Sequence, residues 1–428
     1  MRPNIFLATI GRGSNGSNAL EVTEDRAAVT AESQDNIINR VNNVSQYGPS
    51  WHYVPGIGVA GTAYAEVPGS ALGDLAFTRA SSKTRTNAAG VVETIGNNVP
   101  PHDYRNADGS LSTFPRLNLE PQRTNLMTYS EAFTNASWTK LATGSGTITV
   151  TDNYNISPAG TTTASRLVIN NLGAAYVAKA FTSVNATLYT MSIWAKSNTS
   201  SSYTFQLRDG YSGSVSGNLT VTPTLQRFTF TFTASGTTAE LQFRTIVLGS
   251  YDVSIWGAQL EAGAYPTTYI PTTTAAVTRI ADTASKTGVS SLIGQTEGTL
   301  FVDITLTSRS SFSYFAIAPN LGFVTTYIGI SIASSSISFE VVNSGIQVAY
   351  SFPNTSTGRF KLAFAYKAND FVAYVNGALV HTDTSGTVPT CSQIGLNAYN
   401  NAASWNYNQA ALFPTRLTNA QLAQLTTL

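Results

Sequence analysis

Alternation of apolar and small polar residues is the feature that most constrains the fold of this chain. It is clearest in Arg227–Thr233, which reads Arg-Phe-Thr-Phe-Thr-Phe-Thr, and it recurs in Tyr189–Ala195, Tyr203–Arg208 and Glu240–Ile246. A period of two puts apolar side chains on one face of a strand and polar ones on the other, as in half-buried antiparallel sheets. Gly, Ser and Asn clusters separate the runs, which is typical of sandwiches and jelly rolls. The chain is therefore predicted to be all-β.

A second series of such strands occupies the C-terminal third of the chain and predicts another antiparallel sandwich. Within it, Asn376-Gly377 is a residue pair that favours a type I′ hairpin turn. Thr418 is a good N-cap, and the leucines of 417–425 predict a short closing helix. The Thr/Ala/Pro stretch 267–276 is interpreted as the connection between the two sandwiches.

The first 68 residues lack this strand pattern. Four aliphatic residues recur at helical spacing and predict one short amphipathic helix: Ile37, Ile38, Val41 and Val44. Its apolar face either docks onto another protein or lies on the protein's own sandwich. Residues 48–61, rich in Gly and Pro, are predicted to be an extended linker. The predicted units are an N-terminal anchoring segment, a jelly roll and a second sandwich, with the bounds 1–68, 69–282 and 283–428.

Charge and cysteine content exclude several classes of partner. Charged residues make up only 11% of the 428, the net charge is +1, and there is no basic run, so nucleic acid and anionic membranes are not predicted partners. No window approaches eighteen apolar residues, so no membrane insertion is expected. Cys391 is the single cysteine, which excludes an intrachain disulfide.

No catalytic or metal-binding motif is present, so neither an enzyme nor a cofactor is predicted. The three histidines have no zinc-ligand spacing, and no G-x-S-x-G nucleophile motif occurs. A glycosidase needs two carboxylates across one cleft, but most acidic residues here sit in turns. Glu120 and Glu261 are expected to form ion pairs instead, with candidate partners Arg79, Arg116, Arg123 and Arg279.

Several separated motifs in this order resemble a segment that recurs in bacteriophage fibre, spike and head-decoration proteins. They are Leu75–Glu93, Leu119-Glu-Pro-Gln-Arg-Thr-Asn-Leu126, Gly257-Ala-Gln-Leu-Glu-Ala-Gly263 and Thr278-Arg-Ile-Ala-Asp282. The resemblance covers roughly 75–282 and implies a jelly roll that looks like a carbohydrate-binding module. Residues 297–428 are similar to a concanavalin A-like (laminin-G-type) sandwich.

The resemblance implies a structural protein of the virion surface, made in the bacterial host cytoplasm. Such proteins are commonly trimers, and residues 1–68 would attach this one to another virion protein while the sandwiches contact host or environmental glycans. The alternatives are a secreted bacterial carbohydrate-binding protein and a glycan-cleaving tailspike. The likeness to laminin-G-like sandwiches also leaves open a structural calcium at Asp303 and Asp383, although the chain has no dense run of oxygen ligands.

Glycan binding needs aromatic faces beside hydrogen-bonding groups, because sugar C–H faces stack on rings while hydroxyls bond to amides, carboxylates or guanidinium groups. Two loop regions have this composition. The first combines Tyr203, Arg208, Asp209 and Tyr211, and the second combines Tyr399, Trp405 and Tyr407. The alternative for Trp405 and Tyr407 is that they begin a strand and pack into the core.

Overall fold

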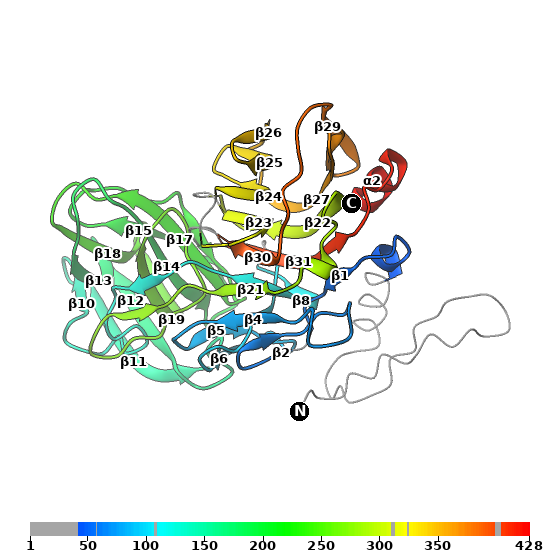
Figure 1. Cartoon of the computed structure of the whole chain (residues 1–428). Coiled ribbons are helices and arrows are strands. Elements are labelled where there is room, and N and C mark those ends of the chain that lie inside the picture. The colour runs from blue at the N-terminus through cyan, green and yellow to red at the C-terminus, as the bar shows by residue number, and fades with distance from the viewer. Residues whose placement is uncertain (1–41, 57, 107–108, 310–312, 323–324, 399–403) are drawn as a thin grey trace.

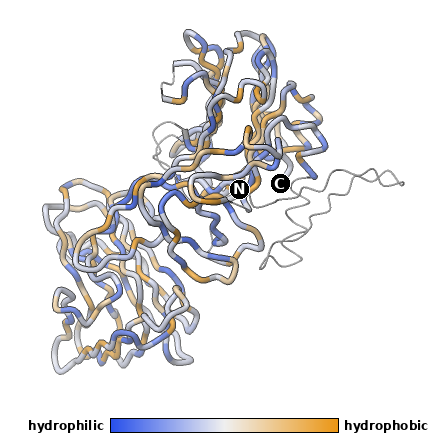
Figure 2. Tube along the Cα trace, turned by 60° about the horizontal axis from the view of Figure 1, so that its bottom comes forward, coloured by the Kyte–Doolittle hydropathy of each residue, from blue (hydrophilic) through white to orange (hydrophobic). Residues whose placement is uncertain are grey.

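The computed structural model describes residues 42–56, 58–106, 109–309, 313–322, 325–398 and 404–428. Strands dominate these residues, and helix is limited to short segments, so the predicted all-β class is confirmed. The strands form two β-sandwiches that lie side by side (Figure 1). Apolar and polar residues are interspersed along the strands of both (Figure 2), as the period-two pattern requires.

The first sandwich consists of two five-stranded antiparallel sheets. The β18 sheet has the order β10 (Thr139–Ala142), β13 (Ala175–Thr182), β18 (Thr238–Thr245), β15 (Tyr203–Asp209) and β16 (Leu219–Val221). The β19 sheet has the order β11 (Thr147–Asn155), β12 (Ala164–Asn171), β19 (Gly249–Ala262), β14 (Leu188–Ser197) and β17 (Gln226–Thr233). Their inner faces enclose one apolar core, whose fully buried members include Leu167, Phe205 and Leu241.

The second sandwich consists of two larger sheets around a separate core that includes Trp51, Phe315 and Phe364. The β22 sheet has the order β29 (Ala378–Asp383), β28 (Phe371–Val375), β27 (Gly358–Lys367), β22 (Glu297–Leu306), β31 (Trp405–Phe413), β8 (Leu111–Leu119) and β7 (His102–Arg105), with β1 (Trp51–Tyr53) also on β31. The β30 sheet has the order β2 (Gly58–Val59), β3 (Thr62–Ala63), β4 (Leu75–Thr78), β21 (Thr283–Thr287), β30 (Gln393–Ala398), β23 (Ser313–Ala318), β24 (Thr326–Ile332), β25 (Ser336–Asn343) and β26 (Ile346–Pro353).

The second sandwich is built from both ends of the described chain. Strand β3 pairs with β4 across the boundary expected at 69, and β4 pairs with β21 and β8 with β31 across the boundary expected at 283. The first sandwich is therefore an insertion, called here the inserted sandwich, and the second is called the host sandwich. The chain enters the insertion through β9 (Arg123–Asn125) and leaves it through β20 (Val277–Arg279), and these two strands pair with each other. Strands β5 (Lys83–Thr86) and β6 (Val92–Ile95) form a separate hairpin, and β5 contacts β7.

The prediction that 48–61 is an extended linker is wrong for Trp51–Tyr53, which form a buried strand of the host sandwich. Trp51 is fully buried in the host core, and its indole Nε1 donates a hydrogen bond to the carbonyl oxygen of Gly73 at 2.8 Å. The large apolar side chains of β1 outweigh the Gly and Pro residues around them because their burial stabilises the strand. Val44, at the described end of the predicted helix, packs against the host sandwich and Leu422. Ile37, Ile38 and Val41 lie outside the described residues.

Two local predictions in the C-terminal part are confirmed. Asn376 and Gly377 both have positive φ, 50° and 85°, and they join β28 to β29. Helix α2 (Asn419–Thr426) begins after Thr418, whose side chain accepts a hydrogen bond from the amide of Gln421, and the Gln421 side chain bonds back in a capping box. A single 3-10 turn, η1 (Ser290–Leu292), precedes β22.

Asp303 and Asp383 lie too far apart to share a calcium ion. Asp303 is on β22 and Asp383 ends β29, and two further strands separate these in the sheet. Arg359 binds both oxygens of Asp303, at 2.9 and 2.6 Å. The carboxylate is therefore already neutralised by a guanidinium group. Among the described residues, no group of three or more potential ligands of the His, Cys, Asp and Glu types could hold a metal ion.

Candidate functional site

The predicted glycan platform at 399–407 does not form around its tryptophan. Trp405 and Tyr407 are both fully buried in the host core, and the Tyr407 hydroxyl accepts a hydrogen bond from the amide of Asn397 at 2.9 Å. Rings with no exposed face cannot stack on a sugar, so this prediction is wrong for both residues. Tyr399 lies outside the described residues.

The other predicted cluster is divided between the two faces of β15. Side chains alternate along a strand, so Tyr203 and Asp209 share the core side with buried Phe205 and Leu207, and Arg208 points the opposite way. Asp209 is buried and accepts hydrogen bonds from the amides of Tyr211, Ser212 and Glu240, so its role is to hold the turn after β15. Tyr203 packs on Tyr251, with ring centroids 5.2 Å apart, and Tyr211 is 61% exposed beyond the strand end. These four residues do not form one site.

Arg208 belongs instead to the outer surface of the β18 sheet, called here the open face. The register pairs Tyr176 with Arg244 and Arg244 with Gln206, which puts a ring, a guanidinium group and a carboxamide side by side on three adjacent strands. In the next row Gln242 lies between Ala178 and Arg208. The open face is defined by Tyr176, Gln206, Arg208, Gln242 and Arg244.

The hydrogen-bonding groups of the open face are only partly satisfied. Gln242 is 5% exposed, and its Nε2 donates to Glu240 at 2.6 Å while its Oε1 is buried without a partner. The Nε groups of Arg208 and Arg244 are also buried without partners, and neither residue forms an ion pair within the described chain. Buried polar atoms normally have a partner, so a bound molecule or water is expected to complete these bonds.

This arrangement suits a polyhydroxylated ligand. Adjacent strands are about 4.8 Å apart, so a row across three strands spans roughly 10 Å. Tyr176 is half-buried and presents an aromatic side chain at one end of the row, while Gln206 at the other end donates to Asn218 at 3.0 Å. The polar positions 240, 242 and 244 alternate with apolar residues, and this pattern is visible in the sequence alone. The register that places them beside Tyr176 is not visible in the sequence.

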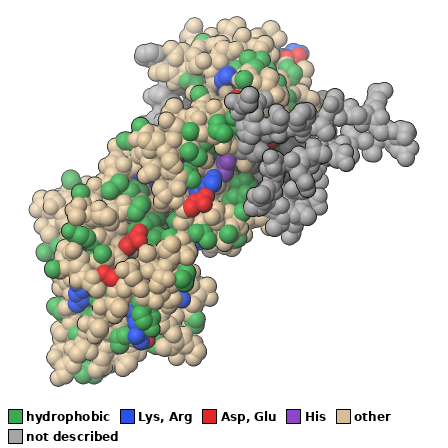
Figure 3. Space-filling view, turned by 90° about the horizontal axis from the view of Figure 1, so that it is seen from below, with side chains coloured by type: hydrophobic (Ala, Val, Ile, Leu, Met, Phe, Trp, Pro, Cys, Tyr) green, Lys and Arg blue, Asp and Glu red, His purple; other side chains and the backbone are tan. Residues whose placement is uncertain are grey.

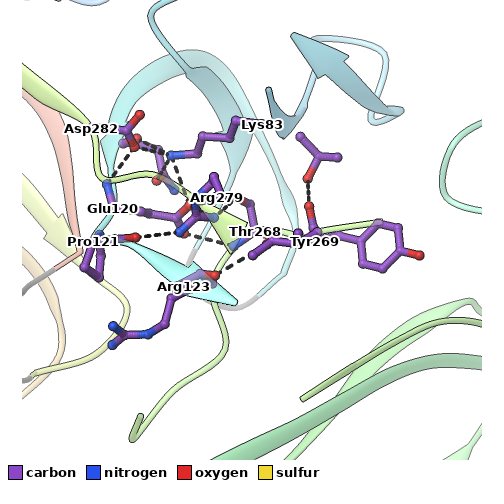
Figure 4. A network of polar contacts seen from close by, with 12 residues as sticks. Lys83, Glu120, Pro121, Arg123, Thr268, Tyr269, Arg279 and Asp282 are labelled. Atoms are coloured by element: carbon purple, nitrogen blue, oxygen red, sulfur yellow. Dashed lines mark hydrogen bonds and ion pairs between the residues drawn. The ribbon is translucent and has the colours of Figure 1, made fainter. Parts of the chain in front are cut away.

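A second group of polar residues lies at the junction of the two sandwiches (Figure 4). Five charged side chains meet there with almost no solvent exposure: Arg79, Lys83, Glu120, Arg279 and Asp282. Asp282 binds Arg79 at 3.0 Å and Lys83 at 2.7 Å, and Glu120 binds Lys83 at 3.0 Å and Arg279 at 2.8 Å. We call this set the junction network. Burial alone would raise the pKa of Glu120, but the charges of Arg279 and Lys83 outweigh that effect and hold the pKa at about 2.

The junction network accounts for part of the ion pairing expected from the sequence. Arg279 does pair with Glu120, whereas Arg116 bonds to Asn408 and Arg123 lies over the ring of Tyr265. Glu261 accepts hydrogen bonds from Gln259 and from the amide of Thr267 in place of an arginine. No local pattern indicates that Lys83 joins two carboxylates, because these partners lie 37 and 199 positions away along the chain.

Next to the junction network is a groove of about 690 Å³. It contains two carboxylates, Asp103 and Glu120, but both are fully engaged. The two oxygens of Asp103 accept hydrogen bonds from the amides of Thr86 and Arg105, and burial raises the pKa of Asp103. Glu120 also accepts two hydrogen bonds from Thr268, in addition to its ion pairs. The oxygens of both carboxylates therefore bond to the protein's own backbone and side chains.

No protein-family model matches the chain, and no curated protein matches it. Among solved structures, it is similar to the CBM40 domain of the Ruminococcus gnavus IT-sialidase bound to α2,3-sialyllactose, with 12% identity over 33% of this chain and 87% of that one and a TM-score of 0.29. It is also similar to the leech intramolecular trans-sialidase, with 14% identity over 33% of this chain and 24% of that one and a TM-score of 0.29. A third similar structure is the binding domain of Botulinum neurotoxin DC, with 11% identity over 34% of this chain and 39% of that one and a TM-score of 0.29. Likenesses this remote carry no inference about ligand or role.

Charged side chains are few on the molecular face in Figure 3. Within the described residues no helix is long and apolar enough to cross a bilayer.

Proposed function

We propose that this protein binds glycans without cleaving them, and that the open face is the binding surface. The observation that carries the proposal is the combination of Gln242, buried with an unpartnered Oε1, and two arginines that have no carboxylate partner. Sugar hydroxyls both donate and accept hydrogen bonds, so they can bond to the partly exposed guanidinium groups of Arg208 and Arg244, whereas Gln242 Oε1 is reached only if its neighbouring side chains shift. Tyr176 supplies an aromatic surface beside them, against which a sugar C–H face can pack.

A glycan array followed by titration calorimetry tests the open face. Arg244→Gln removes a charge-assisted hydrogen bond, whose loss costs about 1.5–3 kcal/mol, so the affinity for the selected glycan should fall by roughly tenfold or more. Tyr176→Ala should also weaken binding. The matched control is Arg166→Gln, on the β19 sheet of the same sandwich, where Arg166 pairs with Asp252 at the surface. Equal affinity in the Arg244 and Arg166 variants would show that the open face is not the site.

The non-enzymatic part of the proposal is supported by the engaged states of Asp103 and Glu120. Incubation with the bound glycan and with capsular polysaccharide, followed by a reducing-end assay, should give no new ends. Steady release of reducing ends would identify a glycan-cleaving tailspike instead.

We further propose that the protein is a surface component of a bacteriophage virion, as a fibre, spike or capsid decoration. Support comes from the motif resemblance over 75–282, whose residues Arg79, Glu120 and Arg279 build the junction network. The proposed assembly is a homo-oligomer, with a trimer expected, attached to another virion protein through residues 1–68. Immunogold labelling of intact particles and sedimentation of the purified full chain test these two points. Unlabelled particles, with secretion from bacterial cells, would favour the alternative of a secreted carbohydrate-binding protein.

A further inference from the structure

The groove beside the junction network is lined by residues from both sandwiches and from the β5–β6 hairpin. One side of it belongs to the outer surface of the β22 sheet, including β7, and the other sides come from β5 and β17. Six residues matter for its chemistry: Arg85, Arg105, Asn118, Arg227, Thr229 and Asn406. None of them belongs to the open face.

Two asparagines lie on the β22-sheet side of the groove. Asn118 on β8 and Asn406 on β31 are register partners, so their side chains lie next to each other on the same side of the sheet. Asn118 Oδ1 accepts a hydrogen bond from Lys83 Nζ at 3.1 Å, which leaves its NH₂ group to donate. Asn406 is only 4% exposed, and its side chain has no hydrogen-bond partner among the described residues. Because Asn406 lines the groove, its carboxamide is available to bond to the groove contents.

The sides of the groove carry guanidinium groups with unused donors. Arg105 donates Nε to Thr86 at 3.2 Å and Nη1 to the carbonyl of Gly109 at 3.0 Å, so its Nη2 is unused. On the β17 side, Arg227 lies 4.3 Å from the ring centroid of Trp194 and is held by the Thr267 carbonyl and the Ser192 hydroxyl. Its Nε is buried without a partner.

The charges around the groove leave a positive excess. Arg105 and Arg227 form no ion pair within the described residues, and Arg85 uses only Nε to bind Glu93. Glu120 is compensated by Lys83 and Arg279, and Asp103 is turned onto two backbone amides. Among the described lining residues, an anion would meet Arg105, which has no ion pair, and Arg227, whose charge is stabilised by the nearby carboxylates of Glu261 and Glu120 without a direct ion pair, and no free carboxylate.

The aromatic side chains at the groove offer no open face for stacking. Arg227 covers one side of Trp194, and Trp256 and Tyr269 pack against it with centroids 5.2 and 5.5 Å away. The groove lining combines hydroxyls such as that of Thr229, carboxamides and guanidinium groups with apolar side chains such as those of Val92 and Leu225. A ligand that fits the polar part of this lining presents hydroxyls and an acid group.

We propose that the groove is a second saccharide site, selective for sugars that carry a carboxylate, such as uronic or sialic acids. The carboxylate lies between Arg105 and Arg227, where guanidinium donors match its two oxygens, and the ring hydroxyls bond to Asn118 and Asn406. This site goes beyond the open face and stands whether or not that face binds neutral glycans.

The test is calorimetric titration of the full-length protein with three carboxylated probes, each beside its methyl ester: tetragalacturonate, a hyaluronan tetrasaccharide and 3′-sialyllactose. At least one acid should bind, and esterification should weaken it about tenfold or more, because each 1.4 kcal/mol is a factor of ten. Added salt should weaken binding of the acid more than binding of the ester.

Two variants assign the binding to the groove. Arg105→Gln should reduce affinity for the acid at least tenfold, and Thr229→Trp should block the groove from an exposed position without removing a buried contact. Arg244→Gln on the open face should leave this affinity unchanged, and thermal unfolding should verify that each variant is folded. The proposal is overturned if no acid binds, if acid and ester bind equally, or if both groove variants bind like wild type. Loss in Arg244→Gln with retention in Arg105→Gln would assign acid binding to the open face instead.

Discussion

Replacing Asp282 by asparagine tests how the two sandwiches are held together. The side chain is fully buried, and its carboxylate holds Arg79 at 3.0 Å, Lys83 at 2.7 Å and the amide of Glu120 at 2.9 Å. Asparagine has nearly the same shape but no charge, and it would leave three buried cations facing the single carboxylate of Glu120. Removing one partner from a buried ion pair typically costs about 3–5 kcal/mol, because the remaining charge stays desolvated.

Urea unfolding followed by tryptophan fluorescence measures this loss of stability. Asp282→Asn should lower the free energy of the first unfolding transition by about 3–5 kcal/mol, which is a large share of the roughly 5–15 kcal/mol that stabilises a typical domain. The control is Glu93→Gln, which breaks the half-exposed pair of Arg85 and Glu93 and should cost about 1 kcal/mol or less.

A double variant separates the charge effect from general damage to packing. Lys83→Met in the Asp282→Asn background removes one of the stranded cations, so the double variant should lose less stability than the sum of the single variants. A coupling of about 1 kcal/mol or more is expected for residues in direct contact. If Asp282→Asn behaves like Glu93→Gln, or if the two effects simply add, the junction network does not stabilise the protein in this way.

Three further predictions concern the core, a turn and acid stability. Trp405→Ala should cost about 3–5 kcal/mol in urea unfolding, since it empties a fully buried site, and it should leave glycan affinity per folded molecule unchanged. Gly377→Ala should cost about 1 kcal/mol because φ is +85°, whereas a mutation at exposed Ala378 to Ser should have no measurable effect. Burial lowers the pKa of His52 to about 4 and that of His102 to about 3, so the unfolded chain binds protons first. Stability should be full above pH 6.5 and fall by up to about 1.4 kcal/mol per pH unit for each histidine below it. His52→Gln should flatten a pH series of thermal melts between pH 6.5 and 4, and an unchanged slope would contradict this assignment.

Local sequence patterns were sufficient for the strands, the hairpin and the last helix. Arg227–Thr233 and Asn376-Gly377 depend on contacts within a few residues, so their conformations follow from side-chain period and turn chemistry. Pairing of β4 with β21 and of β8 with β31 joins segments about 200 and 290 positions apart. Such pairing depends on how whole faces fit together, and no local pattern specifies it.

The residues of the candidate sites likewise divide into those whose placement follows from local sequence and those brought together only by long-range pairing. Trp405 and Tyr407 alternate with Asn406 and Asn408, a period-two signal for a half-buried strand that outweighs the composition of the loop before it. The open face was missed because its members lie on three strands whose register only the fold provides. Arg208 was predicted to bind glycans because of the residues close to it in sequence, whereas the residues close to it in space are Gln242 and Arg244.

Strands β9 and β20 form a short paired stem, through which the inserted sandwich could be exchanged for another domain. Thr124 lies opposite Thr278, so the chain leaves the host sandwich and returns to it at points only about 5 Å apart. Beyond this stem, whose base Glu120 and Arg279 close, the insert is held by the β5–β6 hairpin, where Val92 packs with Trp194 and Trp256. One host could therefore carry different ligand-binding inserts that keep these contacts, and receptor preference could change by exchanging residues 125–277 while the rest of the chain stays as it is.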